Sequence, residues 1–261
     1  MTDTPDILDV SDRTQPLVSI IIPFYRQEAY LLATVESAQR QTHRRIEIIV
    51  VDDGSPISAS SVLGGQAGVR ILRTENSGVA VARNRGFAAS SGEFLVFLDS
   101  DDVLERDAVE GHLMELRRHP EAGMSFGAVR TIDAKGNAIG PPQICGARRR
   151  YVRTFLCRNP IGCPGAVMVR RDAFTKIGGF DKLPFQAEDY LFYLKIVTAF
   201  EVVRHTGCVV AYRRHAMCAS SDKDAMRHGR AVALRWIGPR LTPGELAFMW
   251  CVRVARAASR R

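Results

Sequence analysis

Several common signatures are missing from this sequence of 261 residues. It has no GxGxxG fingerprint, so a dinucleotide-binding dehydrogenase is not indicated, and no GxxxxGK[ST] loop, so phosphate binding would depend on metal and arginine. Its six cysteines are scattered without a CxxC pair, which favours free thiols in a reducing compartment over a disulfide framework. No run reaches the ~20 apolar residues that a membrane span needs. Residues 1–16 are acidic and lack the apolar centre of a signal peptide, so we expect a flexible leader on a cytoplasmic protein.

Positive charge is concentrated at one end of the chain. The net charge is +8, and residues 223–261 hold nine Lys or Arg against two acids, Asp224 and Glu245, so the remainder is almost neutral. A nucleic-acid-binding core would carry its charge on the domain itself. We therefore expect no nucleic-acid partner.

Strand and helix patterns alternate through the first half. The runs LVSIIIP (17–23) and IEIIVVDDGS (46–55) are rich in β-branched residues, as in strands buried on both faces. Further strands are predicted at 69–74 and 93–102, and helices at 28–41, 78–90 and 105–119. This alternation predicts an α/β fold with a largely parallel sheet and helices on both faces.

The second half is less regular. We expect two strands around a Lys-Gly-Asn turn within 124–140, a loop at 141–151 with three consecutive arginines, and a short strand, a short helix and a Gly-Gly stop within 165–180. A strong helix at 187–200 and a late strand at 208–215 follow. No linker divides the chain into two full domains.

Carboxylates follow two of the predicted buried strands, in VVDDGS and in FLDSDD. In α/β sheets ligands bind outside the carboxyl ends of the strands, so both sets should face one crevice. The Asp-x-Asp of FLDSDD offers hard oxygen ligands of the kind that Mg²⁺ and Mn²⁺ prefer. Asp101 or Asp102 could instead cap the next helix, but a cap does not account for three acids.

Taken together, seven stretches resemble the inverting GT-A glycosyltransferases of family 2. They run in family order from Leu17 to His215, and only the asparagine usual after Pro-x-Tyr is replaced, by Arg26. The resemblance implies a GT-A, Rossmann-like, mixed but mostly parallel sheet over 17–222, with a nucleotide-sugar half (17–102), an acceptor half (103–222) and a basic helical extension (223–261). The stretches are VSIIIPFYRQEAYLLATVESAQRQ, IEIIVVDDGS, NSGVAVARNRG, FLDSDD, GGFD, AEDYLFYLK and YRRH.

The resemblance also implies roles for individual residues. The donor would be a UDP- or dTDP-sugar, and a divalent metal, Mn²⁺ or Mg²⁺, would neutralise its diphosphate. Asp189, with Glu188 as second choice, would be the base that deprotonates an acceptor hydroxyl. Acids at the start of a helix are also common for a structural reason, because the helix dipole stabilises negative charge there. Asp181 would help form the acceptor pocket. The donor is assigned to Pro23, Tyr25, Glu28, Asp53, Arg83 and Asp99, and the metal to Asp101, Asp99 and His215.

Other functions and partners stay open at this point. A non-catalytic sugar-nucleotide-binding protein of the same fold, or a metal-dependent nucleotidyltransferase, would use a similar site. The acceptor would be a glycan or a lipid-linked glycan of the bacterial cell surface. The segment 242–261 predicts a basic amphipathic helix that contacts the anionic inner membrane surface or packs on the catalytic domain or on a second subunit. Arg148, Arg149 and Arg150 would close over the donor or lie in solvent.

Overall fold

The computed structural model describes residues 15–143, 151–183, 187–216, 218 and 222–258. Its centre is one mixed sheet of eight strands in the order β3-β2-β1-β4-β7-β6-β8-β5. The strands are β1 (Val18–Phe24), β2 (Ile46–Asp52), β3 (Val69–Arg73), β4 (Phe94–Phe97), β5 (Val103–Leu104), β6 (Ala122–Ile132), β7 (Val167–Arg170) and β8 (Glu201–Arg213).

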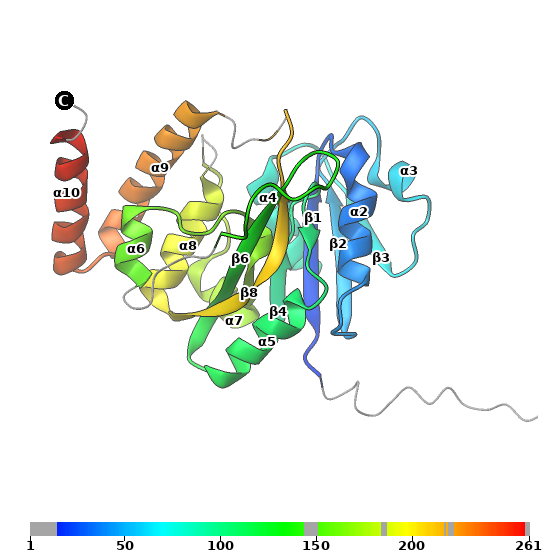
Figure 1. Cartoon of the computed structure of the whole chain (residues 1–261), viewed down its shortest axis with the longest axis horizontal. Helices are drawn as coiled ribbons and strands as arrows, with labels where there is room; N and C mark the ends of the chain where they lie inside the picture. The colour runs from blue at the N-terminus through cyan, green and yellow to red at the C-terminus, as the bar shows by residue number, and fades with distance from the viewer. Residues whose placement is uncertain (1–14, 144–150, 184–186, 217, 219–221, 259–261) are drawn as a thin grey trace, which may run out of the picture.

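Helices cover both faces of this sheet (Figure 1). They are α2 (Glu28–Gln39), α3 (Ala59–Leu63), α4 (Val79–Ala88), α5 (Ala108–Arg118), α6 (Tyr151–Cys157), α7 (Arg171–Ile177), α8 (Glu188–Ala199), α9 (Lys223–Ile237) and α10 (Pro243–Ala258), with single 3-10 turns η1 (Pro164–Ala166) and η3 (Gly238–Arg240).

The first half of the sheet is parallel, as the alternating pattern predicted. β1 lies between β2 and β4, and β3 completes the edge beside β2. Every residue of β1 is buried, because helices cover the sheet on both sides. The apolar runs therefore end at one edge of the sheet, and the polar segments after β1, β2 and β4 meet there.

The second half joins the same sheet with mixed strand directions. β7 pairs antiparallel with β4 and β6, β6 pairs parallel with β8, and β5 pairs antiparallel with β8. The predicted α/β fold with a mixed, mostly parallel sheet is confirmed. Residues 17–102 and 103–222 share this sheet, and the assignment of the donor and acceptor to these two halves stays a prediction.

Three sequence-based expectations of secondary structure were wrong. Segment 124–140 forms one strand, β6, and the residues after Ile132 pair with it only through isolated bridges. The expected turn is present, and in it the Asp133 carboxylate accepts from the amides of Lys135 and Asn137. The strand expected at 93–102 ends at Phe97, so the acids lie in the turn that follows it. β8 begins earlier than predicted, and His215 lies beyond its end.

The C-terminal extension packs along one side of the molecule (Figure 1). α9 packs on α8, and α10 packs on α6. Phe248 and Met249 turn toward the core, and the Arg153 guanidinium lies over the Phe248 ring, 5.1 Å from its centre. Packing on the catalytic domain, one of the alternatives that the sequence left open, is therefore observed. In the described part of the chain, no helix combines the length and the apolar character that crossing a bilayer requires.

Candidate active site

A cavity of about 470 Å³ opens where β1, β2 and β4 end. Residues from seven segments of the sequence meet in its lining: 23–27, 53, 76–83, 99–101, 162–164, 188–189 and 212–226. Eight of the ten predicted site residues line it: Pro23, Tyr25, Asp53, Arg83, Asp99, Asp101, Glu188 and Asp189. Glu28, the first residue of α2, and His215 are not among its lining residues. Most of the predicted site residues therefore lie in one cavity.

The two aspartates after β2 have different partners. Asp52 is fully buried, and its carboxylate accepts from the amides of Ser55 and Ala59 and from Arg73. Asp53 accepts from the amides of Ser77 and Gly78, at 2.9 and 2.8 Å. Asp53 thus fixes the loop before α4 at the edge of the cavity, and Asp52 stabilises the turn after β2.

The turn 98–102 directs its three aspartates to different neighbours. Asp99 accepts from Arg83 at 2.7 Å, and Asp101 contacts His215. Asp102 is fully buried and accepts from the Arg213 amide, which ties the turn to the end of β8. Burial, with added repulsion from Asp101 and Asp99, raises the pKa of Asp102 well above its ordinary value. Asp102 does not cap α5, since the residue before that helix is Asp107.

Arg83 joins an acid that follows β4, Asp99, to an acid that begins α8, Glu188. Its side chain is 2% exposed, and its two terminal nitrogens donate to Asp99 and Glu188 at 2.7 and 2.8 Å. Burial acts to lower the pKa of Arg83, but these carboxylates outweigh burial, so the pKa lies above its ordinary value. The guanidinium also lies over the Phe180 ring, 5.2 Å from its centre. Arg83 therefore fixes the position of the turn after β4 relative to the start of α8.

The two acids at the start of α8 have different hydrogen-bond partners. Glu188 is held by Arg83, whereas Asp189 accepts from the Tyr190 amide at 2.6 Å. Burial and the neighbouring Glu188 charge raise the pKa of Asp189 to about 7, against the opposing effect of Arg83. A carboxylate with such a pKa is suited to accept a proton near neutral pH.

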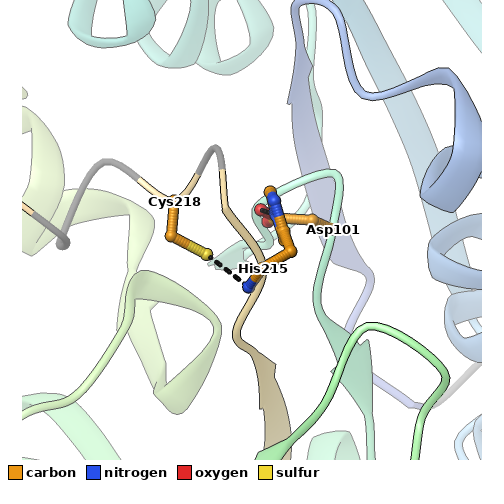
Figure 2. A group of neighbouring side chains, drawn as sticks. All are labelled: Asp101, His215 and Cys218. Carbon is orange, nitrogen blue, oxygen red and sulfur yellow. Dashed lines mark hydrogen bonds and ion pairs between the residues drawn. The ribbon is translucent and has the colours of Figure 1, made fainter.

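His215 lies beside Asp101, in the segment that follows β8 (Figure 2). Its Nε2 is 2.8 Å from Asp101 Oδ2, and its ring contacts that of Tyr30, with centroids 4.9 Å apart. The sequence proposed both residues as metal ligands. It gave no reason to include Cys218, whose sulfur accepts from the His215 amide at 3.2 Å.

Two further positions show how the loops are held. Asp181 does not line the cavity; it pairs with the buried Lys195 at 2.7 Å, and Lys195 also donates to the Gly179 carbonyl. Arg26 adopts φ 55°, a left-handed conformation that asparagine tolerates better than arginine. This backbone requirement gives a physical reason for the asparagine usual at this position. Arg148, Arg149 and Arg150 lie outside the described residues.

Comparison with known proteins identifies the family. The family model of glycosyl transferase family 2 matches residues 19–178. The chain belongs to this family. It is 33% identical over 187 residues to a chondroitin synthase of Escherichia coli, an alignment that covers 69% of this chain and 26% of that protein.

Other relatives match over more of their length. The chain is 31% identical over 214 residues to the E. coli UDP-Glc:alpha-D-GlcNAc-diphosphoundecaprenol beta-1,3-glucosyltransferase WfaP, covering 79% of this chain and 81% of that one. It spans 62% of an uncharacterized glycosyltransferase of Haemophilus influenzae to which it is 29% identical over 182 residues, which is 69% of this chain.

A solved structure matches the fold. The crystal structure of S. aureus TarS 1–349 in complex with UDP-GlcNAc superposes with a TM-score of 0.69 at 18% identity, covering 92% of this chain and 73% of that one. This likeness confirms the GT-A arrangement expected from the sequence.

Proposed function

We propose that this protein is an inverting glycosyltransferase that moves a sugar from a UDP- or dTDP-sugar to a hydroxyl of a glycan or lipid-linked acceptor. The observation that carries the proposal is the meeting of Asp53, Asp99, Asp101 and Asp189 in one cavity. In this cavity Arg83 joins Asp99 to Glu188. Related proteins are named for UDP-glucose transfer and chondroitin synthesis, and the structural neighbour holds UDP-GlcNAc. These relatives favour a UDP-sugar in cell-surface polysaccharide synthesis.

The donor would lie across the carboxyl ends of β1, β2 and β4. Tyr25 is 41% exposed at the end of β1, so its ring is available for stacking on a base. Pro23 and Asp53 would complete the nucleoside side, with Glu28 at the start of α2. Asp53 reaches this position because two backbone amides hold its carboxylate. Arg83 and Asp99 would orient the diphosphate side.

The residues beside Asp101 fit a divalent metal. The Asp101 carboxylate is an oxygen ligand of the kind that Mn²⁺ and Mg²⁺ prefer, and phosphate oxygens of the donor would complete the site. His215 Nε2, 2.8 Å from Asp101 Oδ2, would add a nitrogen ligand. Asp99 would act through its pair with Arg83 or as a further ligand. When bound, the metal would supply a Lewis acid for the leaving diphosphate.

Asp189 is our choice of base, with Glu188 as its neighbour. The Glu188 carboxylate is already held in an ion pair with Arg83. Asp189 has a pKa of about 7 and lines the same cavity as Asp99 and Asp101. Asp189 would deprotonate the acceptor hydroxyl, whose oxygen attacks the anomeric carbon opposite the diphosphate, so that the carbon inverts.

The C-terminal helix would bring the protein to the cytoplasmic membrane surface, where a lipid-linked acceptor is available. Trp250 is 66% exposed and Leu246 38% exposed on α10, and the two residues lie one turn apart on the helix. Arg253 and Arg256 would contact anionic headgroups, although their side chains, like Arg260, lie outside the described residues. Sedimentation of the full chain with anionic vesicles tests this: Trp250→Ser should pellet less, and equal pelleting would remove the idea. A homo-oligomer remains open to measurement by sedimentation velocity.

A panel of nucleotide sugars tests the proposed activity. Incubated with Mn²⁺ or Mg²⁺, the protein should release nucleoside diphosphate from at least one UDP- or dTDP-sugar. A nucleotidyltransferase would instead release pyrophosphate from a nucleoside triphosphate. A binding protein of the same fold would retain the donor unchanged, and either result would overturn the proposal.

A further inference from the structure

Cys218 brings a sulfur atom to the pair formed by Asp101 and His215. One ligand atom from each residue lies within 4.8 Å of the other two. Figure 2 shows the His215 side chain beside Asp101, which comes from the turn after β4, and the Cys218 sulfur directed at the His215 amide in the segment after β8. Cys218 and Asp101 also line the cavity. We refer to these three residues as the Asp-His-Cys triad.

The chemistry of the triad differs from that of a site for Mg²⁺. Mg²⁺ and Mn²⁺ favour oxygen ligands, whereas a thiolate with an imidazole and a carboxylate is a set typical of Zn²⁺ and Co²⁺. From these three donors we infer that the triad binds Zn²⁺ or Co²⁺ through Asp101 Oδ2, His215 Nε2 and Cys218 Sγ, with the fourth position left to solvent or phosphate.

The adjustment that this binding needs is small. Ligand lengths of ~2.1 Å to oxygen or nitrogen and ~2.3 Å to sulfur place tetrahedral ligand atoms roughly 3.4–3.6 Å apart. The Asp101–His215 pair would open from 2.8 Å, and the widest separation, at most 4.8 Å, would close by about 1 Å. Small rotations about the side-chain torsions of these partly buried residues would supply both changes.

The backbone around Cys218 suits a bound thiolate. The His215 amide already donates to Sγ at 3.2 Å, a contact that supports a ligating sulfur. The thiol now donates to the Arg213 carbonyl at 3.2 Å. Metal binding would break that hydrogen bond, release the thiol proton to solvent and leave the imidazole neutral.

The triad shares Asp101 with the metal of the proposed transfer reaction. A Zn²⁺ ion held by sulfur would therefore displace Mn²⁺ and change the charge and position of the cation beneath the diphosphate. This consequence for turnover rests on the proposed function. The binding of Zn²⁺ or Co²⁺ itself rests on the triad alone.

Co²⁺ absorption spectroscopy on the full, chelator-treated chain tests the inference without any sugar nucleotide. Wild type should develop a sulfur-to-cobalt charge-transfer band in the near ultraviolet at one equivalent of Co²⁺. Cys218→Ser should lose the band and bind Co²⁺ at least tenfold more weakly. The matched control is Cys208→Ser, because the Cys208 thiol also lies beside a carboxylate, Glu105, and should keep the band.

Two results would overturn the inference: a wild-type protein without the band, or a Cys218→Ser variant that keeps it. Unfolding temperatures without metal show whether the variants remain folded. In a second arm, Zn²⁺ should inhibit Mn²⁺-supported diphosphate release, and Cys218→Ser should need at least tenfold more Zn²⁺. Absence of any turnover would count against the proposed function. The charge-transfer band would still show whether the Asp-His-Cys triad binds the metal.

Discussion

Asp99 and Glu188 accept hydrogen bonds from the two terminal nitrogens of one buried arginine, Arg83. One acid follows β4 and the other begins α8, so this contact fixes the expected diphosphate side of the cavity relative to the expected base. A planar guanidinium can hold two carboxylates in fixed directions, which an ammonium does not reproduce.

Replacement of Arg83 should damage both stability and activity. Arg83→Lys keeps the charge but loses the bridging geometry, so one partly buried carboxylate loses its hydrogen bond at a cost of ~1.5–3 kcal/mol. We expect a lower urea midpoint and at least a hundredfold loss of kcat/KM. Arg85→Lys is the matched control, because Arg85 lies on the same helix and donates to the Glu75 carbonyl near the surface. Equal effects of the two substitutions would contradict the bridging role.

The rate of transfer should rise with pH through the pKa of Asp189. A base acts only when deprotonated, so with a pKa of about 7 the rate should increase tenfold per pH unit below 7 and level off above it. Glu188→Gln removes a like charge that raises this pKa, so the acidic limb should move to lower pH. Asp189→Asn should remove the limb and nearly all activity, while the exposed Asp172→Asn should change neither.

A pH profile of kcat for these variants decides between the two acids. If Asp189→Asn retained the limb and Glu188→Gln abolished it, Glu188 would be the base. If neither substitution moved the limb, the titrating group would lie elsewhere.

The buried His112 should make the fold sensitive to acid. Burial, with repulsion from His205, lowers the pKa of His112 to about 3 from an ordinary value of 6.5. Between these values the unfolded chain binds more protons than the folded one, so stability is complete above pH 6.5 and falls as the pH drops toward 3. His112→Gln should be less stable at pH 7 but should show a shallower loss on acidification. Urea midpoints across this range measure it, and the exposed His119→Gln should retain the full slope.

A methyl group on Gly86 should push α4 away from β1. Its Cβ would lie 2.3 Å from Cγ2 of the buried Ile21, a contact that requires the helix to shift. We expect Gly86→Ala to cost ~1–3 kcal/mol in unfolding free energy and to lower activity, since α4 carries Arg83. The control is Gly238→Ala, where no heavy atom lies within 4 Å of the added carbon and the backbone is helical. A Gly86→Ala protein as stable as wild type would contradict this, because it would show that α4 and β1 can accommodate the added methyl group without loss of stability.

Features determined by local sequence were predicted well. The β-branched runs of β1 and β2 required burial on both faces, and a parallel sheet brings the acids behind such strands to one edge. Asp53, Asp99 and Asp101 therefore reached the cavity as expected. Glu188 and Asp189, which the family resemblance assigned to the site, also line the cavity, and their role as base stays a prediction.

Features set by pairing between distant segments were not predictable in this way. The two residues of β5 form a strand only because β8 lies beside them. Nothing local to Arg83 indicates that Glu188 will be its partner, and the scattered cysteines gave no signal that Cys218 would lie near His215. His215 was expected on a strand, but β8 ends at Arg213, where the Asp102 carboxylate accepts the last strand amide.

The anomeric configuration of the first product tests the central claim of inverting transfer most directly. Proton NMR during turnover of an α-linked UDP-sugar should show the β-anomer forming first, on the acceptor or on water, and Asp189→Asn should abolish it. A product that appears first as the α-anomer, or full turnover by Asp189→Asn, would contradict the account.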